Sequence, residues 1–196
     1  RKMSPDASAA AQVQGSWANN GRGFTVGRGQ YSGGKWIELT FGRPLKRGRD
    51  LWGSGANYGK DLLVGGQMPI WRAGADVATQ LKTEVPLTIG GKAIAPGTYT
   101  LFIDVKENNW TLVVSTWAAQ AKYDPNDKSA LWGSYGYTRD KDVVRTKMKL
   151  ETMTHSFEEL SWQLLDVTDT SATLSIVWDK VVASVPVTKG EGWIRG

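Results

Sequence analysis

The chain has 196 residues, of which 40% are hydrophobic, and a formal net charge of +5. This length and apolar content suffice for one domain with a sizeable core, while the modest positive charge gives only a long-range preference for anionic partners. The absence of cysteine excludes disulfides and thiolate metal sites. The sequence contains no run of about 18 to 20 apolar residues, the length that would predict a transmembrane segment.

Residues 1–34 are predicted to form an irregular, flexible, glycine-rich N-terminal arm. Glycine frees the backbone over much of this segment, and its few apolar side chains do not offset the entropy of ordering. We expect Trp17, Phe24, Val26 and Tyr31 to pack on the domain, or to contact a protein partner or a second copy of the chain by strand addition. Arginine and glycine in the arm are also typical of segments that bind single-stranded nucleic acid.

Alternating hydrophobicity after the arm predicts an all-β fold. Ile37, Leu39 and Phe41 fall on one face of the first core strand. Similar alternation marks further strands at 81–94 (two short strands), 99–105 and 110–114 (a hairpin), 144–150, 160–164, 174–178 and 181–187. We therefore predict an antiparallel two-sheet β-sandwich of jelly-roll or immunoglobulin-like type over residues 35–190, followed by a C-terminal tail at 191–196.

An ordered set of motifs runs through this domain. They are FGRPLKRGR at 41–49, LWG at 51–53, WRAGA at 71–75, AT at 78–79, APGTY at 95–99, WT at 110–111 and WGSY at 132–135. In this order they resemble the bacterial family called domain of unknown function twenty-nine-eleven, over about residues 36–187. Two departures from the family pattern are a longer connection at 54–70 and Val77, where relatives often have glutamate.

The resemblance implies a single small domain made with a signal peptide or lipoprotein leader. It therefore implies an extracytoplasmic location, in the periplasm, on the outer surface or secreted. It brings no established reaction, ligand or cofactor. Export also argues against nucleic acid as a partner.

A fixed ligand site is predicted around two of the motifs. Arg47 and Arg49 stand in an irregular loop, where guanidinium groups can make bidentate contacts with carboxylate or phosphate. Trp71, Arg72 and Asp76 belong to the second motif and can either extend that site or form a structural cluster of ion pairs and stacked rings. The sequence leaves both interpretations open.

Ten tryptophans are a high number for this length. Trp110, Trp162 and Trp178 alternate with aliphatic residues and are predicted to lie in the core. The tryptophans in connecting segments are expected to be more exposed, namely Trp52, Trp117 and Trp132. Since flat aromatic faces commonly hold sugar rings, Trp132 is a candidate ligand-binding residue, and a polysaccharide or another anionic envelope component is a candidate partner.

No catalytic, metal or cofactor motif is complete. His155 is the only histidine, and the acidic turn at 124–128 lacks the glycine and the closing glutamate of a calcium loop. The carboxylates that the fold could bring together are Glu38, Asp76, Asp104 and Glu158. We predict a non-catalytic extracytoplasmic binding or assembly subunit. The alternative is a carbohydrate-binding module or a carbohydrate-active hydrolase.

Overall fold

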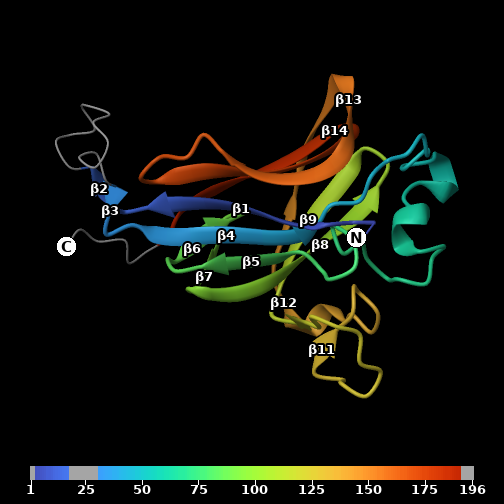
Figure 1. Cartoon of the computed structure of the whole chain (residues 1–196), viewed down its shortest axis with the longest axis horizontal. Helices are drawn as coiled ribbons and strands as arrows, with labels where there is room; N and C mark the ends of the chain where they lie inside the picture. Colours follow the sequence, from blue (N-terminus) through green and yellow to red (C-terminus); the bar gives the residue numbers. More distant parts are fainter. Residues whose placement is uncertain (1–2, 18–30, 191–196) are drawn as a thin grey trace.

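Two antiparallel sheets form the body of the protein in the computed structural model (Figure 1), which describes residues 3–17 and 31–190. The larger sheet has the order β1 (Asp6–Val13), β4 (Lys35–Gly42), β5 (Gln80–Thr83), β8 (Gly97–Lys106), β9 (Asn109–Ser115), β12 (Asp142–Lys147). The smaller sheet has the order β13 (Lys149–Leu165), β14 (Ser171–Lys189), β6 (Leu87–Ile89), β7 (Lys92–Ile94). The prediction of an all-β, two-sheet sandwich is confirmed.

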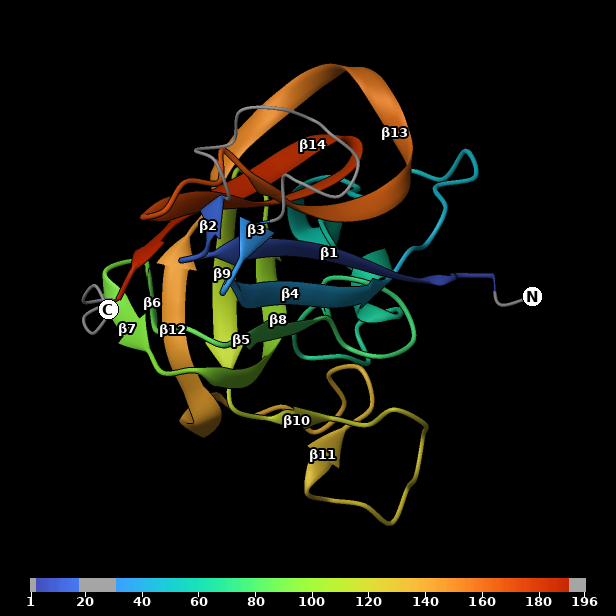
Figure 2. The same cartoon turned by 60° about the vertical axis from the view of Figure 1, so that its left-hand side comes forward.

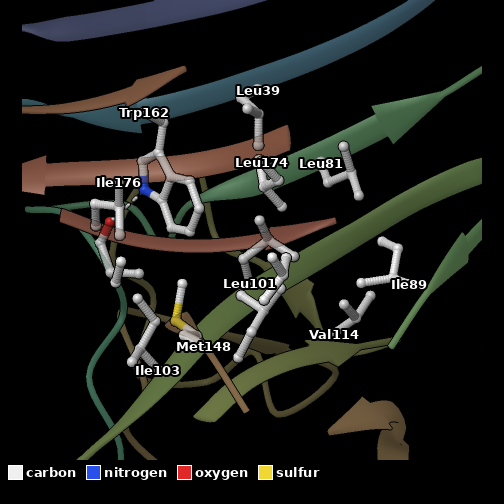
Figure 3. Close-up of a cluster of buried hydrophobic side chains, with 14 of the residues drawn as sticks. Leu39, Leu81, Ile89, Leu101, Ile103, Val114, Met148, Trp162, Leu174 and Ile176 are labelled. Carbon is white, nitrogen blue, oxygen red and sulfur yellow. Dashed lines mark hydrogen bonds between the residues drawn. The ribbon is translucent and has the colours of Figure 1, made fainter. Parts of the chain in front are cut away.

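One hydrophobic core fills the space between the sheets (Figure 3). Alternation along each strand supplies it, so that Leu101 and Ile103 of β8 point inward while Phe102 between them points outward. The indole N–H of Trp162 donates a hydrogen bond of 2.8 Å to the carbonyl oxygen of Ala73, which satisfies its polar atom inside the core. The prediction that Trp110, Trp162 and Trp178 lie in the core is confirmed.

Residues 80–94 form three short strands rather than the two expected over 81–94. β5 belongs to the larger sheet, whereas β6 and β7 belong to the smaller one. Pro86 lies between β5 and β6, and a proline has no N–H with which to continue a ladder. The chain therefore crosses from one sheet to the other at this point.

The N-terminal segment differs from the predicted irregular arm over residues 6–13. This stretch is β1, which pairs with β4 along its whole length. Ala7 and Ala9 pack against the core, and Val13 is buried. Alanine has a low strand propensity, so its alternation is a weak signal in the sequence. A strand forms here because β4 offers it a partner and the core covers its inner face.

A short hairpin follows β1. β2 (Ser16–Trp17) pairs with β3 (Tyr31–Ser32), and the rings of Trp17 and Tyr31 lie with their centroids 5.3 Å apart. The Tyr31 hydroxyl accepts a hydrogen bond of 2.7 Å from the backbone N–H of Gly15. The other two arm residues of the prediction, Phe24 and Val26, and the predicted tail at 191–196 lie outside the described residues.

The connections between strands cover the outside of the larger sheet and one end of the sandwich. The connection from β9 to β12 contains β10 (Ala118–Ala119), β11 (Ala130–Leu131) and the 3-10 helix η4 (Arg139–Lys141). It lies on the side of the larger sheet that faces away from β13 and β14 (Figure 2). A second, smaller apolar cluster lies beneath it, made of Ile70, Ala78, Phe102, Val113 and Leu131.

The connection from β4 to β5 contains the 3-10 helices η2 (Gly55–Asn57) and η3 (Asp61–Leu63). These helices are only one turn long each. In the two described stretches of the chain, no helix has the length and apolar character needed to cross a membrane.

Candidate functional site

The arginine-rich segment packs on the hairpin formed by β13 and β14. The Arg43 guanidinium lies 2.5 Å from the Glu159 carboxylate, and Lys46 Nζ lies 2.5 Å from Asp179 Oδ1. These two cations therefore have carboxylate partners within the chain. The partners belong to β13 and β14, far from this segment in the sequence.

The two predicted site residues of this segment lie in different environments. Arg47 has a positive φ of 53° and is exposed. Arg49 donates hydrogen bonds of 2.9 and 2.5 Å to two carbonyl oxygens of its own loop, and its guanidinium carbon lies 6.0 Å from the ring centroid of Trp178. Arg49 therefore fixes its loop against the core. Because two N–H groups of its guanidinium are used in this way, Arg49 has fewer donors for a ligand.

Trp71 belongs to a cluster of four tryptophans. The other members are Trp52, Trp110 and Trp178, and the contacting rings have centroids between 4.9 and 6.3 Å apart. Trp52 was expected to be more exposed, but it packs against the core. Asp50 Oδ1 accepts hydrogen bonds from the backbone N–H groups of Trp52 and Gly53, and this turn directs the chain inward. The cluster fills one end of the core rather than forming an open platform.

The loop over residues 72–79 contains two non-glycine residues with positive φ, Ala73 at 55° and Asp76 at 59°. Such backbone conformations are unfavourable and persist where the surroundings hold them. The Ala73 carbonyl oxygen accepts hydrogen bonds from Thr79 Oγ1 at 2.9 Å and from the Trp162 indole at 2.8 Å. These buried contacts fix the loop in which Arg72 stands.

The Arg72 guanidinium is partly buried, and within the described residues it has neither a hydrogen bond nor an ion pair. Burial lowers the pKa of Arg72, while the negative charges of Asp76 and of the Tyr135 phenol, when ionised, act in the opposite direction. Since a guanidinium has five N–H donors and keeps its charge in proteins, Arg72 retains unused capacity for binding an anion.

An open groove of about 370 Å³ lies in the connection between β9 and β12. Four aromatic side chains line it, those of Trp117, Tyr123, Trp132 and Tyr135. Tyr123 is 60% exposed and Tyr135 is 38% exposed, and the rings of Tyr123 and Trp132 have centroids 6.3 Å apart. Trp117 forms a fixed wall, since Lys141 Nζ lies 3.7 Å above its ring.

One buried side chain, that of Gln120, holds the rim of the groove. Its Nε2 lies 3.0 to 3.2 Å from the carbonyl oxygens of Asp124, Asp127 and Ala130, and its Oε1 accepts a hydrogen bond from the Asp124 N–H. A single amide therefore ties both sides of the loop together. The aromatic rings stand on a preorganised backbone rather than on a loosely held one.

The carboxylates at the rim also organise the loop. Asp124 Oδ1 accepts a hydrogen bond from the Asn126 N–H, and Asp127 Oδ1 accepts two from Ser129. The hydrogen bonds from Ser129 lower the pKa of Asp127, so this carboxyl group is ionised at neutral pH. Over residues 3–17 and 31–190, no cluster of three or more potential metal ligands occurs.

A larger groove, of about 500 Å³, lies beside the start of β1 and the end of β4. Most of its lining side chains are small, including Ala7, Ser8, Ala78, Ala119 and Ala121. Its aromatic residue, Phe41, is buried in the core. This groove lacks the flat exposed rings that characterise the smaller one, so its size alone does not make it the better candidate.

The predicted site residues therefore separate into two places. Trp132 lines the aromatic groove, with Arg72 close behind it, whereas Trp71 is buried and Arg49 packs on the tryptophan cluster. The sequence analysis missed the groove residues Tyr123 and Tyr135. The available signal was an aromatic residue within each of two turn-forming stretches, KYDPND at 122–127 and GSYG at 133–136.

The protein is therefore an all-β sandwich with an open aromatic groove outside its larger sheet. The chain belongs to the family described as "Protein of unknown function (DUF2911)", whose model matches residues 27–187. The family resemblance predicted from the motifs is thereby confirmed. No curated protein and no solved structure matches the chain.

Proposed function

We propose that this protein is a carbohydrate-binding protein without catalytic activity, and that the aromatic groove between β9 and β12 holds the sugar. The observation that carries the proposal is the convergence of Trp117, Tyr123, Trp132 and Tyr135 on one open groove. Aromatic faces cover the apolar face of a sugar ring, and ligand sites combine such surfaces with a few fixed polar groups. The volume of about 370 Å³ lies in the usual range for a small ligand.

Binding is favoured over hydrolysis by the state of the carboxylates. Glycoside hydrolysis needs one carboxyl group that is protonated at working pH and a second that is ionised. In the groove, hydrogen bonds from Ser129 lower the pKa of Asp127, which makes it a poor general acid near neutral pH. Of the carboxylates considered from the sequence, Asp104 is paired with Arg145, and Glu158 accepts a hydrogen bond from the Arg47 backbone.

A glycan array followed by titration calorimetry tests the proposal. We expect the wild-type protein to bind at least one oligosaccharide, and Trp132→Ala to weaken that binding at least about tenfold, equivalent to about 1.4 kcal/mol. Trp36→Ala is the matched control, since Trp36 is 42% exposed on β4 and does not line the groove. No binding by the wild-type protein, or equal losses in both variants, would contradict the proposal.

A second role, contact with a protein partner or another copy of the chain, is favoured by Trp17. Its side chain is 54% exposed at the β2–β3 hairpin, and exposed tryptophan is enriched in protein interfaces. Because β1 belongs to the sheet, Trp17→Ser is a cleaner test than removal of the whole N-terminal segment. We expect this variant to have a lower mass by light scattering than the wild-type protein, and equal masses would exclude a homo-oligomer that depends on Trp17.

The extracytoplasmic location implied by the family resemblance is part of the proposal. A sugar-binding protein of the cell exterior would meet polysaccharide directly. Fractionation of cells that produce the full-length precursor tests this location. Recovery of the protein in the cytoplasm alone would contradict it.

A further inference from the structure

The aromatic groove has a charged side chain directly behind its wall. Gly133 stands between Trp132 and Tyr135, both of which line the groove, and has a positive φ of 60°. A Cβ atom added at Gly133 would lie 3.1 Å from Arg72 Nη1 and 3.3 Å from Arg72 Cδ. The nearest atom to that Cβ would be Met68 Cε at 2.9 Å, so Arg72 and the buried Met68 share the space that a glycine leaves free behind the groove wall.

Arg72 is also held in place without using its own donors. The Ser134 hydroxyl donates a hydrogen bond to the carbonyl oxygen of Ile70, which joins the groove wall to the segment that leads into Arg72. On its other side, the backbone carbonyl of Arg72 accepts a hydrogen bond of 3.2 Å from the Thr79 N–H. The backbone is fixed at both ends, while the guanidinium has no hydrogen-bond partner among the described residues. A guanidinium with unused donors on a fixed backbone is an arrangement suited to an anion subsite.

Tyr135, which lines the groove, connects it to this guanidinium and to Gln67, which both lie outside the groove lining. The Tyr135 hydroxyl lies 3.5 Å from Gln67 Oε1, which is a long and weak hydrogen bond, so the hydroxyl can turn to a better acceptor. The Asp76 carboxylate and, when ionised, the Tyr135 phenol carry charges close enough to Arg72 to affect its pKa. Arg72, Tyr135 and Gln67 thus offer a planar cationic fork, a hydroxyl and an amide in one neighbourhood.

We propose that the groove prefers acidic sugars, and that Arg72, assisted by Tyr135 and Gln67, binds the carboxylate of a uronic acid unit whose ring stacks on Trp132 and Tyr123. This inference rests on the proposed sugar-binding function and specifies its ligand class. A guanidinium matches a carboxylate with two parallel N–H···O bonds, which a neutral hydroxymethyl group cannot accept in the same geometry. The net charge of +5 attracts such polyanions from a distance.

Carboxyl reduction supplies the test, because it converts each uronate to the corresponding neutral sugar and leaves the ring unchanged. The probes are oligosaccharides of polygalacturonate, alginate and hyaluronate, each titrated before and after reduction. We expect at least one acidic oligosaccharide to bind at least about tenfold more tightly than its reduced form. Arg72→Gln should remove that difference and leave binding of the reduced form within about twofold.

Three further variants separate charge, geometry and stacking. Arg72→Lys retains the charge but loses the bidentate fork, so we expect it to recover only part of the preference. Tyr135→Phe retains the ring and should weaken acidic oligosaccharides alone, whereas Trp132→Ala should weaken both forms. If Arg72→Gln does not fold, as judged by thermal unfolding, the preference of the wild-type protein and the Arg72→Lys and Tyr135→Phe variants decide the question.

The outcomes for this inference and for the proposed function are distinct. If the wild-type protein binds acidic and reduced oligosaccharides equally, or if Arg72→Gln weakens both equally, the acidic-sugar subsite is wrong and sugar binding stands. If the wild-type protein binds neither form of any probe and no sugar on the array, both proposals are wrong.

Discussion

The protein places its tryptophans in two contrasting surroundings. Trp52, Trp71, Trp110 and Trp178 pack edge to face or stacked at one end of the core, where the large rings fill space between the sheets. Trp117 and Trp132 stand on a connection outside the larger sheet, where they line an open groove. The same side chain thus stabilises the fold in one place and presents a surface to solvent in the other. The two regions should respond to substitution in opposite ways.

The tryptophan cluster should give the largest change in stability. Trp110 is buried, and its indole N–H donates a hydrogen bond of 3.2 Å to the Tyr58 hydroxyl. We expect Trp110→Ala to lower the free energy of unfolding by about 3–5 kcal/mol, because it leaves a cavity and an unpaired hydroxyl. Urea unfolding followed by circular dichroism measures this. A loss below about 1 kcal/mol, similar to that of exposed Trp36→Ala, would mean that the cluster is not close-packed.

The side chain that holds the groove should affect both stability and binding. Gln120→Leu keeps the side-chain size but removes the donors to three carbonyl oxygens and the acceptor for the Asp124 N–H. We expect a loss of about 2 kcal/mol in unfolding free energy, together with weaker sugar binding. Gln163→Leu, at an exposed position of β13, is the matched control. Normal binding by a destabilised Gln120→Leu protein would show that the groove does not depend on this amide.

An ion pair beside the tryptophan cluster should give a smaller, pH-dependent effect. Burial raises the pKa of Asp179, but hydrogen bonds from Lys46 and Ser156 outweigh it, so the net pKa lies below the usual value of 3.8. A carboxyl group with a depressed pKa in the folded state contributes stability above its unfolded pKa, and this contribution is lost as the pH falls through the folded pKa. Asp179→Asn suits the local φ of 51°, since asparagine tolerates that conformation.

We therefore expect Asp179→Asn to lower the unfolding free energy at pH 7 by about 1 kcal/mol or less. The difference from the wild-type protein should shrink as the pH falls below about 4, because the wild-type carboxylate is then protonated. Urea unfolding at a series of pH values measures this. A difference that stays constant down to pH 2 would assign the effect of the substitution to local backbone conformation instead of charge.

The groove tryptophan should give the smallest change in stability and the largest change in binding. We expect Trp132→Ala to change the unfolding free energy by less than about 1 kcal/mol, as is usual for side chains outside the core. Thermal and urea unfolding measure this on the same samples used for sugar titration. A loss of several kcal/mol would place Trp132 with the structural tryptophans and remove the contrast between the two regions.

Local patterns in the sequence predicted much of the fold. Alternation at Ile37, Leu39 and Phe41 and along β8 and β9 encodes which side chains face the core, because successive residues of a strand point to opposite faces. β1 was missed because its inward residues Ala7 and Ala9 are small, so its pairing depends on β4 rather than on its own apolar surface. The aromatic groove was foreseen only at Trp117 and Trp132.

The sequence by itself determined the all-β class, the family and the burial of Trp110, Trp162 and Trp178, since these follow from local periodicity and from ordered motifs. Only the tertiary structure decided which cations have internal partners, that Trp52 joins the core, and that Arg72 lies behind Gly133 at the wall of the groove. The physical reason is distance along the chain. Arg72 and Gly133 come together because the fold brings two connections against each other, and no local pattern of residues records such a contact.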